Sequence, residues 1–220
     1  MRMKSAHIRN FRALEEIDID FTSQTIVIGP NNSGKSTLIT ALDWFFNGEK
    51  NSIDQSDISN LKNPETTEIY VEIIFDQLTV KDAETIGPKY IQSNTRELQI
   101  RKTYLNGDTK ISGMFLRFPI FDPIRAASGK EAKKAALSVI STQHPELSAP
   151  PYTTEAAVNT WMEDWEEDHP DQLVYGFGDE THLKGAVGQA TINSLFEFIP
   201  IRVDLNMDEE LQDKKQSTIG

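Results

Sequence analysis

The sequence predicts an α/β fold, and three observations carry that prediction. A Gly-rich phosphate-binding loop at residues 29–37 stands between a β-branched apolar run at 25–28 and an apolar, helix-like run at 37–46. Downstream, residues 68–118 alternate around an Asn-Gly turn and indicate an antiparallel β-layer. Upstream, two alternating strands are predicted before residue 22. The order strand, Gly-rich loop, helix is the context that a phosphate-binding loop requires.

The loop has the sequence GPNNSGKST and fits the pattern G-x-x-x-x-G-K-[ST] at every required position. Its two glycines allow backbone dihedrals that side chains would forbid, so the loop can wrap a phosphate closely. Its N–H groups and the positive end of the following helix dipole both favour an anion. A chance match in a loop of another fold is the alternative. The residues expected to contact the nucleotide are Gly29, Asn31, Asn32, Ser33, Gly34, Lys35, Ser36 and Thr37.

Three of these residues have individual roles. We expect Lys35 to reach the β- and γ-phosphates, which makes it the catalytic candidate. The hydroxyl of Ser36 is expected to ligate Mg²⁺, and Thr37 can add a phosphate contact at the start of the helix.

The remaining elements follow from periodicity, turns and caps. The first helix should end at Asn47-Gly48, because glycine favours helix C-termini. Thr154 can cap an acidic helix whose apolar stripe would be Ala157, Trp161 and Trp165. Residues 49–66 are polar and predict a surface loop. We expect strands at 3–10, 16–21, 68–75, 97–104, 109–118 and 196–202, helices at 77–88, 130–141, 154–168 and 183–195, and a polar, helix-prone tail at 204–220.

Composition sets broad limits. The 220 residues suffice for one large domain, and 38% of them are hydrophobic. No apolar run approaches the roughly 20 residues of a membrane span, and no apolar signal core follows the N-terminus. Without cysteines there are no disulfides or thiolate metal sites, and we expect a cytoplasmic protein with no membrane partner. The net charge of −12 argues against strong DNA binding by this chain alone.

A family resemblance covers essentially the whole chain in order and is sharpest at residues 8–12 and 29–37. Ile8-Arg9-Asn10-Phe11-Arg12, an alternating strand and then the loop resemble the amino end of ABC-type ATPase heads of the SMC/RecF group, and within it the OLD (overcoming lysogenization defect) nucleases and related phage-defence ATPases. The β-layer is similar to the ATP-binding lobe of that family. Phe198-Ile199-Pro200-Ile201-Arg202 resembles a stretch that precedes a helical arm in OLD-like proteins. We therefore expect an ATP-binding lobe at 1–203 and the start of an arm or tail at 204–220.

The resemblance implies a mechanism and partners. ATP and Mg²⁺ would sit on the loop, and two heads would sandwich two nucleotides as a homodimer, or a separate C-terminal half would complete the site. Hydrolysis would open the dimer and control DNA binding, repair or an attached nuclease through the full assembly. Arg12 would lie near the phosphates or base, or else be a surface turn residue. Arg202 would face the nucleotide or simply pair with Asp204.

The sequence departs from the family in its second half. No signature serine loop, D-loop, switch histidine or Toprim metal motif is convincing. Asp76 is followed by Gln77 where a catalytic glutamate would stand, and Asp179-Glu180 follows a Gly-rich stretch, 175–178, that makes a poor buried strand. Gln77 and Gln189 are the candidates for the glutamine loop, each more simply explained as a surface residue. The chain therefore resembles an amino-terminal lobe, either a truncated piece or half of a split gene.

Two other function classes are weighed. A GTPase should show N/T-K-x-D and D-x-x-G motifs, and a small kinase should show an Arg-rich lid; neither is present. A non-catalytic interaction module could keep the loop for a structural nucleotide. The four histidines, His7, His144, His169 and His182, are not at metal-ligand spacing.

Overall fold

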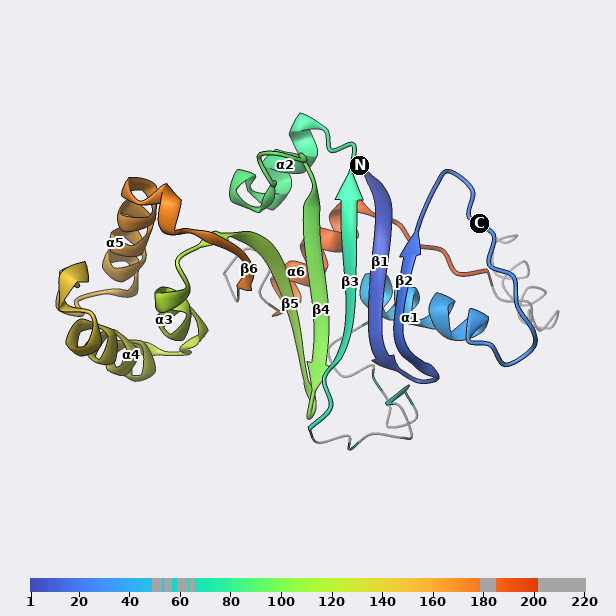
Figure 1. The fold of residues 1–220 in the computed structure, drawn as a ribbon, viewed down its shortest axis with the longest axis horizontal. Coiled ribbons are helices and arrows are strands. Elements are labelled where there is room, and N and C mark those ends of the chain that lie inside the picture. The colour runs from blue at the N-terminus through green and yellow to red at the C-terminus, as the bar shows by residue number, and fades with distance from the viewer. Residues whose placement is uncertain (49–52, 54–56, 59–62, 64–65, 179–184, 202–220) are drawn as a thin grey trace, which may run out of the picture.

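A computed structural model describes residues 1–48, 53, 57–58, 63, 66–178 and 185–201, with only the backbone described for 185–187. One antiparallel sheet of six strands has the order β2-β1-β3-β4-β5-β6 (Figure 1). The predicted α/β class with an antiparallel β-layer is confirmed. The strands are β1 (Arg2–Phe11), β2 (Leu14–Asp20), β3 (Ile69–Asp76), β4 (Leu98–Leu105), β5 (Asp108–Arg117) and β6 (Val174–Gly178). The α-helices are α1 (Lys35–Asn47), α2 (Val80–Ile86), α3 (Asp122–Ala126), α4 (Lys130–Gln143), α5 (Glu155–Asp168) and α6 (Gly185–Leu195).

The sheet has one apolar face, because side chains on a strand alternate between the two faces. Across the register, Ile8 on β1 is opposite Val71 on β3, and Val71 is opposite Lys102 on β4. Lys102 is in turn opposite Ile111 on β5. All four side chains are buried, so this row places one lysine among apolar neighbours.

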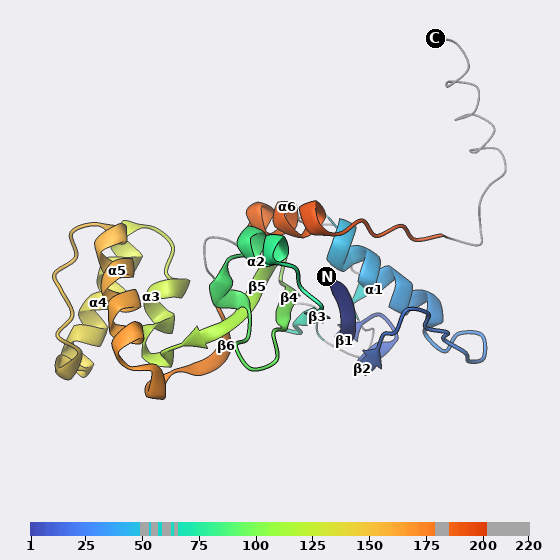
Figure 2. The same cartoon turned by 90° about the horizontal axis from the view of Figure 1, so that it is seen from above.

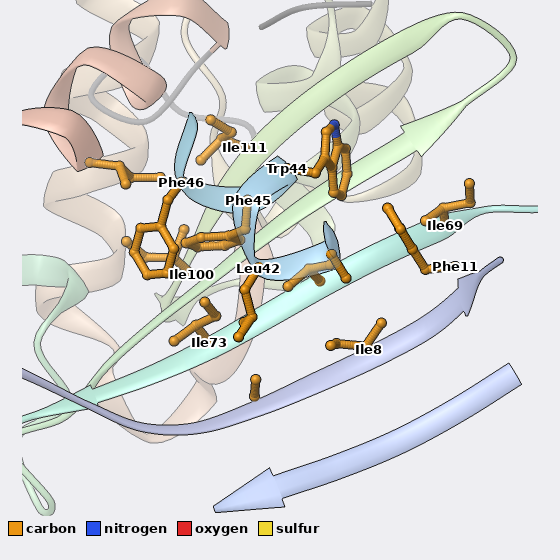
Figure 3. Packing of buried hydrophobic residues seen from close by; sticks show 14 of the residues in the cluster. Ile8, Phe11, Leu42, Trp44, Phe45, Phe46, Ile69, Ile73, Ile100 and Ile111 are labelled. Atoms are coloured by element: carbon orange, nitrogen blue, oxygen red, sulfur yellow. The ribbon is translucent and has the colours of Figure 1, made fainter. Parts of the chain in front are cut away.

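Helices α1, α2 and α6 lie on that apolar face, as Figure 2 shows. Leu42, Phe45 and Phe46 of α1 point toward the strands, where they meet Ile73 and Ile100 among others (Figure 3). Phe45 is fully buried, which is worth about 2–3 kcal/mol in transfer free energy. This packing fixes α1, and with it the loop at the N-terminal end of α1, against the sheet.

The first helix ends where the sequence predicts. Gly48 is its C-cap, and the Gly48 N–H donates to the carbonyl oxygen of Trp44 at 3.0 Å. The backbone of Gly48 is extended and not left-handed, so the helix ends here without the positive φ that usually makes glycine favourable at a C-terminus.

A separate group of helices, α3 to α5, is inserted between β5 and β6 and lies beyond the β6 end of the sheet (Figures 1 and 2). A buried ion pair joins two of its helices: Arg125 donates to Glu166 at 2.7 Å, and Glu166 also accepts the backbone N–H of Phe118 at 2.6 Å. Its own hydrophobic core consists of Phe118, Phe121, Ile124, Leu137, Ile140, Leu147, Val158 and Met162.

The cap of α5 is confirmed, and so are two of the three residues of its predicted apolar stripe, Trp161 and Trp165, which pack against the core of this helical group; Ala157 is wrong. The side chain of Thr154 accepts the N–H of Ala157 at 3.1 Å. The fully buried residues are Val158 and Met162, whereas the predicted Ala157 is exposed. Trp161 and Trp165 are half-buried and contact Phe121.

The strand predicted at 25–28 is wrong: these residues have no strand pairing within the described chain. Ile26 is 72% exposed and Ile28 is 89% exposed. A β-branched run becomes a strand only when a neighbouring strand accepts its backbone hydrogen bonds. None of the described strands lies beside it.

The strand predicted at 196–202 is also wrong over its described part, 196–201, which has no strand pairing. Phe196 and Phe198 lie against Phe46 of α1, with ring centroids 5.5 and 5.2 Å away. Ile199 and Ile201 are 70% and 83% exposed. Aromatic packing on α1, and not a β-ladder, holds this segment.

Residues 174–178 form a strand, β6, at the edge of the sheet, and none of its residues is buried, as expected for a Gly-rich stretch that would make a poor buried strand. Its glycines have close neighbours where a Cβ would lie, and neither has a positive φ. A Cβ on Gly178 would lie 2.5 Å from the ring of Phe115, and one on Gly176 would meet the guanidinium of Arg117.

The surface loop predicted at 49–66 lies mostly outside the described residues, but two of its described members are core residues. Ile53 and Ile58 are 8% and 6% exposed, and Ile58 forms a β-bridge with Phe11. The predicted tail at 204–220 lies outside the described residues. Within the described part of the chain, every helix is too short or too polar to cross a lipid bilayer.

Candidate functional site

The phosphate-binding loop has an alternating backbone. Asn32 and Gly34 have positive φ angles of 66° and 89°, whereas Ser33 and Lys35 between and after them do not. Alternation of this kind turns successive N–H groups toward one concave side and makes an anion-binding nest. Asparagine tolerates the left-handed conformation better than most residues, which explains Asn32.

The N-terminal end of α1 opens onto this loop without a side-chain cap. Gly34 is the N-cap residue, and no side chain of the described chain accepts a hydrogen bond from the first turn. The first turn also lacks an acidic residue. Its N–H groups and the positive end of its dipole therefore remain available to an anion.

Lys35 is the first residue of α1, and its ammonium group folds back into the loop. It donates to the carbonyl oxygens of Gly29 at 2.8 Å and Pro30 at 2.6 Å. Ser36 is exposed and Thr37 is half-buried in the same first turn of α1. These groups suit a nucleotide with bound magnesium. The positive charge of Lys35 lies in the loop, and the exposed residue Ser36 beside it offers a hydroxyl as a metal ligand.

Two glycines of the loop have close neighbours where a Cβ would lie. A Cβ on Gly34 would lie 2.9 Å from Cδ2 of Leu14, the first residue of β2. A Cβ on Gly29 would lie 2.6 Å from Oγ of Ser33 and would take up space on the concave side of the phosphate-binding loop. The contact with Leu14 also shows that the β1–β2 turn lies against the start of α1.

Arg12 lies in that turn, with a φ of 50°, and its partner is Asp57 rather than a loop residue. Its Nε donates to Oδ1 of Asp57 at 2.5 Å, and its backbone N–H donates to the Asp57 carbonyl at 2.7 Å. The pair borders a cavity of about 220 Å³ beside α1 that Thr40 and Trp44 also line. Nε1 of Trp44 is buried there and has no hydrogen-bond partner among the described residues.

Of the candidates for second-half motifs, those within the described residues are not paired with the loop. Asp76 at the end of β3 binds Arg2 through two hydrogen bonds, of 2.9 and 2.5 Å. The hydrogen bonds from Arg2 hold the pKa of Asp76 below its ordinary value. Gln77 has a φ of 53° just after β3. Asp179-Glu180 and Arg202 lie outside the described residues, and no His, Asp or Glu cluster in the described part could hold a metal ion.

Gln189 is not the simple surface residue that the sequence suggested. It lies on α6, half-buried, and its Nε2 donates to the carbonyl oxygen of Phe46 at 2.6 Å. Lys102 was not singled out from the sequence. It stands two residues after Ile100 and four after Leu98 on β4, so the alternation of the strand places all three side chains on the core face.

Comparisons with known proteins agree with this geometry. Residues 1–170 match the family described as AAA ATPase domain. A 41-residue stretch is 42% identical to an OLD nuclease of Thermus scotoductus and covers 19% of this chain and 8% of that protein. A 92-residue stretch is 30% identical to the Old nuclease of Escherichia phage P2 and covers 40% of this chain and 15% of that protein.

A third relative is a putative ABC transporter ATP-binding protein of Pyrococcus furiosus, 28% identical over 128 residues, which are 55% of this chain and 46% of that protein. This chain thus spans less than half of each of these relatives. The resemblance to an ATPase head of the OLD and ABC type is confirmed. With the family matched over most of its length, the chain belongs to the AAA ATPase domain family.

Proposed function

We propose that residues 1–203 form the ATP- and Mg²⁺-binding lobe of an ATPase of the OLD, RecF and SMC type. The observation that carries the proposal is the position of the Lys35 ammonium, 2.8 Å from the Gly29 carbonyl, inside a loop whose N–H groups form a nest. A phosphate chain supplies the negative charge that both the nest and the ammonium favour.

In this proposal each group of the loop has one task. The loop N–H groups and the α1 dipole bind the phosphates, and Lys35 neutralises charge at the β- and γ-phosphates. Ser36 would hold Mg²⁺, and the ion would supply charge neutralisation at the same phosphates. Arg12 would reach the nucleotide by exchanging its contact with Asp57, since its turn already lies against Gly34 through Leu14.

The lobe is proposed to act together with a second element, supplied by a second copy or by a C-terminal half. Two segments without strand pairing, at 25–28 and 196–201, carry isoleucines that are largely exposed. Asp76, the one described candidate for a Walker B aspartate, is engaged by Arg2. The general base and the signature serine would then come from that second element, and coupling to DNA binding, repair or nuclease control would need the full cytoplasmic assembly.

Steady-state turnover tests this function. We expect this chain alone to bind Mg·ATP in preference to Mg·GTP and to hydrolyse it far more slowly than a complete head. Lys35→Ala should remove what binding and turnover there are. Rapid, Lys35-dependent turnover by this chain would contradict the need for a second element, and tighter binding of GTP would favour a GTPase instead.

A further inference from the structure

The C-terminal end of α1 is held by two side chains from other elements. The ammonium of Lys102 on β4 donates to the carbonyl oxygens of Trp44 and Gly48, each at 2.7 Å. It also donates to Oε1 of Gln189 on α6 at 2.7 Å. Gln189 in turn donates to the carbonyl oxygen of Phe46 at 2.6 Å. The carbonyls of Trp44 and Phe46 lie in the last turn of α1, where intrahelical pairing runs out, and that of Gly48 belongs to the C-cap. The Trp44 carbonyl oxygen also accepts the Gly48 N–H, so the ammonium is its second donor.

We propose that Lys102 and Gln189 form a proton-dependent clamp on the C-terminal end of α1, which positions the phosphate-binding loop at the other end. The inference rests on the proposed nucleotide-binding function and adds a positioning residue to it. Lys102 touches neither nucleotide nor loop: it acts through α1, a rigid helix about 20 Å long.

The number of donors makes the clamp depend on a proton. A charged ammonium has three N–H groups, and here three acceptors lie at hydrogen-bonding distance. A neutral amine has two, so loss of the proton breaks one bond and turns a lone pair toward an oxygen. The protonated form is further favoured by the Trp44 ring, 5.0 Å from Nζ, and by the negative end of the α1 dipole.

Burial opposes the charge. Lys102 is 1% exposed, and burial lowers its pKa from 10.5 to about 7. Deprotonation can therefore occur near neutral pH, where an ordinary lysine would stay charged.

In the described part of the chain, the other charged groups near Lys102 do not replace this proton. The neighbours of Lys102 across the sheet are Val71 and Ile111, and α6 carries no ionisable side chain. On β3 and β4, Glu72 and Arg101 are paired with each other at 2.5 Å, on the opposite face. Lys110 of β5 adjoins Ile111 and so also points to the other face.

On α1 the charged residues are Lys35, bound in the loop, and Asp43, which accepts a hydrogen bond from Asn47 at 2.8 Å. Among the described residues, burial is the cause of the lowered pKa of Lys102, and none of them forms an ion pair with its ammonium. A shift of α1 would therefore change the lengths of the hydrogen bonds that the Lys102 ammonium makes to its last turn and C-cap.

Linkage gives the test. If the protonated clamp holds α1 in the nucleotide-binding position, then nucleotide must raise the proton affinity of Lys102 by the same factor. We expect about fivefold, at the lower end of typical couplings, which raises the titration midpoint by about 0.7 pH unit. A side chain that merely fills and caps the core would titrate at the same pH with and without nucleotide.

The experiment is an NMR titration of the full chain labelled with ¹³C at lysine Cε, alone and saturated with Mg·ADP. Lys102→Met identifies the resonance by its absence, and Gln189→Leu identifies it by a shift if Lys102→Met does not fold. We expect a midpoint near 7 that rises with Mg·ADP, and a smaller rise in Gln189→Leu. In parallel, the Mg·ADP affinity of wild type relative to Lys102→Met should fall about fivefold between pH 6 and pH 8.5.

The outcomes separate the two proposals. Saturable binding of Mg·ADP with an unchanged Lys102 midpoint would overturn the clamp and leave the nucleotide-binding function standing. A Lys102 that stays charged to pH 9 would overturn the proton dependence in the same way. Failure of the wild-type chain to bind Mg·ADP at any pH would overturn both.

Discussion

Leu14 and Gly34 are in close contact: Cδ2 of Leu14 lies 2.9 Å from the position that a Cβ on Gly34 would occupy. This contact joins the first turn of the sheet to the start of α1. It adds a steric requirement to the conformational one, because Gly34 also has a φ of 89°.

Gly34→Ala should therefore lower the free energy of unfolding by more than the strain of a left-handed alanine alone. Gly107, in the β4–β5 turn, has a φ of 87° and nothing within 4 Å of its Cβ position, so Gly107→Ala is a matched control. Each variant should lose about 1–2 kcal/mol of unfolding free energy to backbone strain. Gly34→Ala should lose more, and its Mg·ATP affinity should fall at least about tenfold, as measured by denaturant unfolding and nucleotide titration. Equal effects of the two variants on stability and on affinity would show that the Leu14 contact is unimportant.

Lys102→Met should change how stability depends on pH. Between the folded pKa of about 7 and the unfolded value of 10.5, the unfolded chain holds a proton on this lysine that the folded chain lacks. Wild-type stability therefore rises with pH across this window because of Lys102, and it does not change on this account below pH 7. The free energy of unfolding of the wild type, minus that of Lys102→Met at the same pH, should rise by roughly 1 kcal/mol per pH unit from pH 7 to 9. Parallel curves from denaturant unfolding would place the pKa of Lys102 in its ordinary range.

Arg12 and Asp57 offer a test of which partner matters to Arg12. If Arg12 exchanges Asp57 for nucleotide, Arg12→Ala should weaken Mg·ATP binding, whereas Asp57→Asn should leave it unchanged or strengthen it. A charged hydrogen bond is worth about 1.5–3 kcal/mol, so Arg12→Ala should weaken binding by about tenfold or more. If both variants lose stability alike while affinity stays constant, the pair is structural and Arg12 has no role in the site.

The helical insertion should be separable from the loop. Phe121 is fully buried in its core, and Phe121→Ala should cost about 3–5 kcal/mol there. Val139 on α4 is 52% exposed, so Val139→Ala should change stability by less than about 0.5 kcal/mol. Hydrogen exchange should show faster opening of α3 to α5 in Phe121→Ala only, with Mg·ATP affinity unchanged. Loss of affinity in that variant would mean that the insertion and the loop are coupled.

Much of the sheet could be predicted from the sequence because its signals are local. The Asn106-Gly107 turn, with φ angles of 48° and 87°, sets the β4–β5 hairpin, and alternation fixes which face of each strand is buried. The Gly-Lys-Ser pattern likewise predicted the loop and the start of α1. The roles of the loop residues toward a nucleotide stay predictions.

What the sequence could not supply depends on contacts between distant residues. Residues 25–28 have strand composition, but a strand exists only with a partner, and none is described beside them. Gln189 could not be connected to Phe46 or Lys102 without the packing of α6 on α1. The position of Arg12 beside Asp57 depends on a long-range pairing that no local pattern records.

The most direct test of the central claim is the affinity of this chain for Mg·ATP, measured by isothermal titration calorimetry for wild type, Lys35→Ala and Lys110→Ala. Lys110 lies on β5, exposed and outside the loop, and so provides a matched loss of one lysine. Binding by wild type and by Lys110→Ala, with a loss of about tenfold or more in Lys35→Ala, is the predicted result. Equal affinities in all three proteins, or none in wild type, would contradict a nucleotide site at residues 29–37.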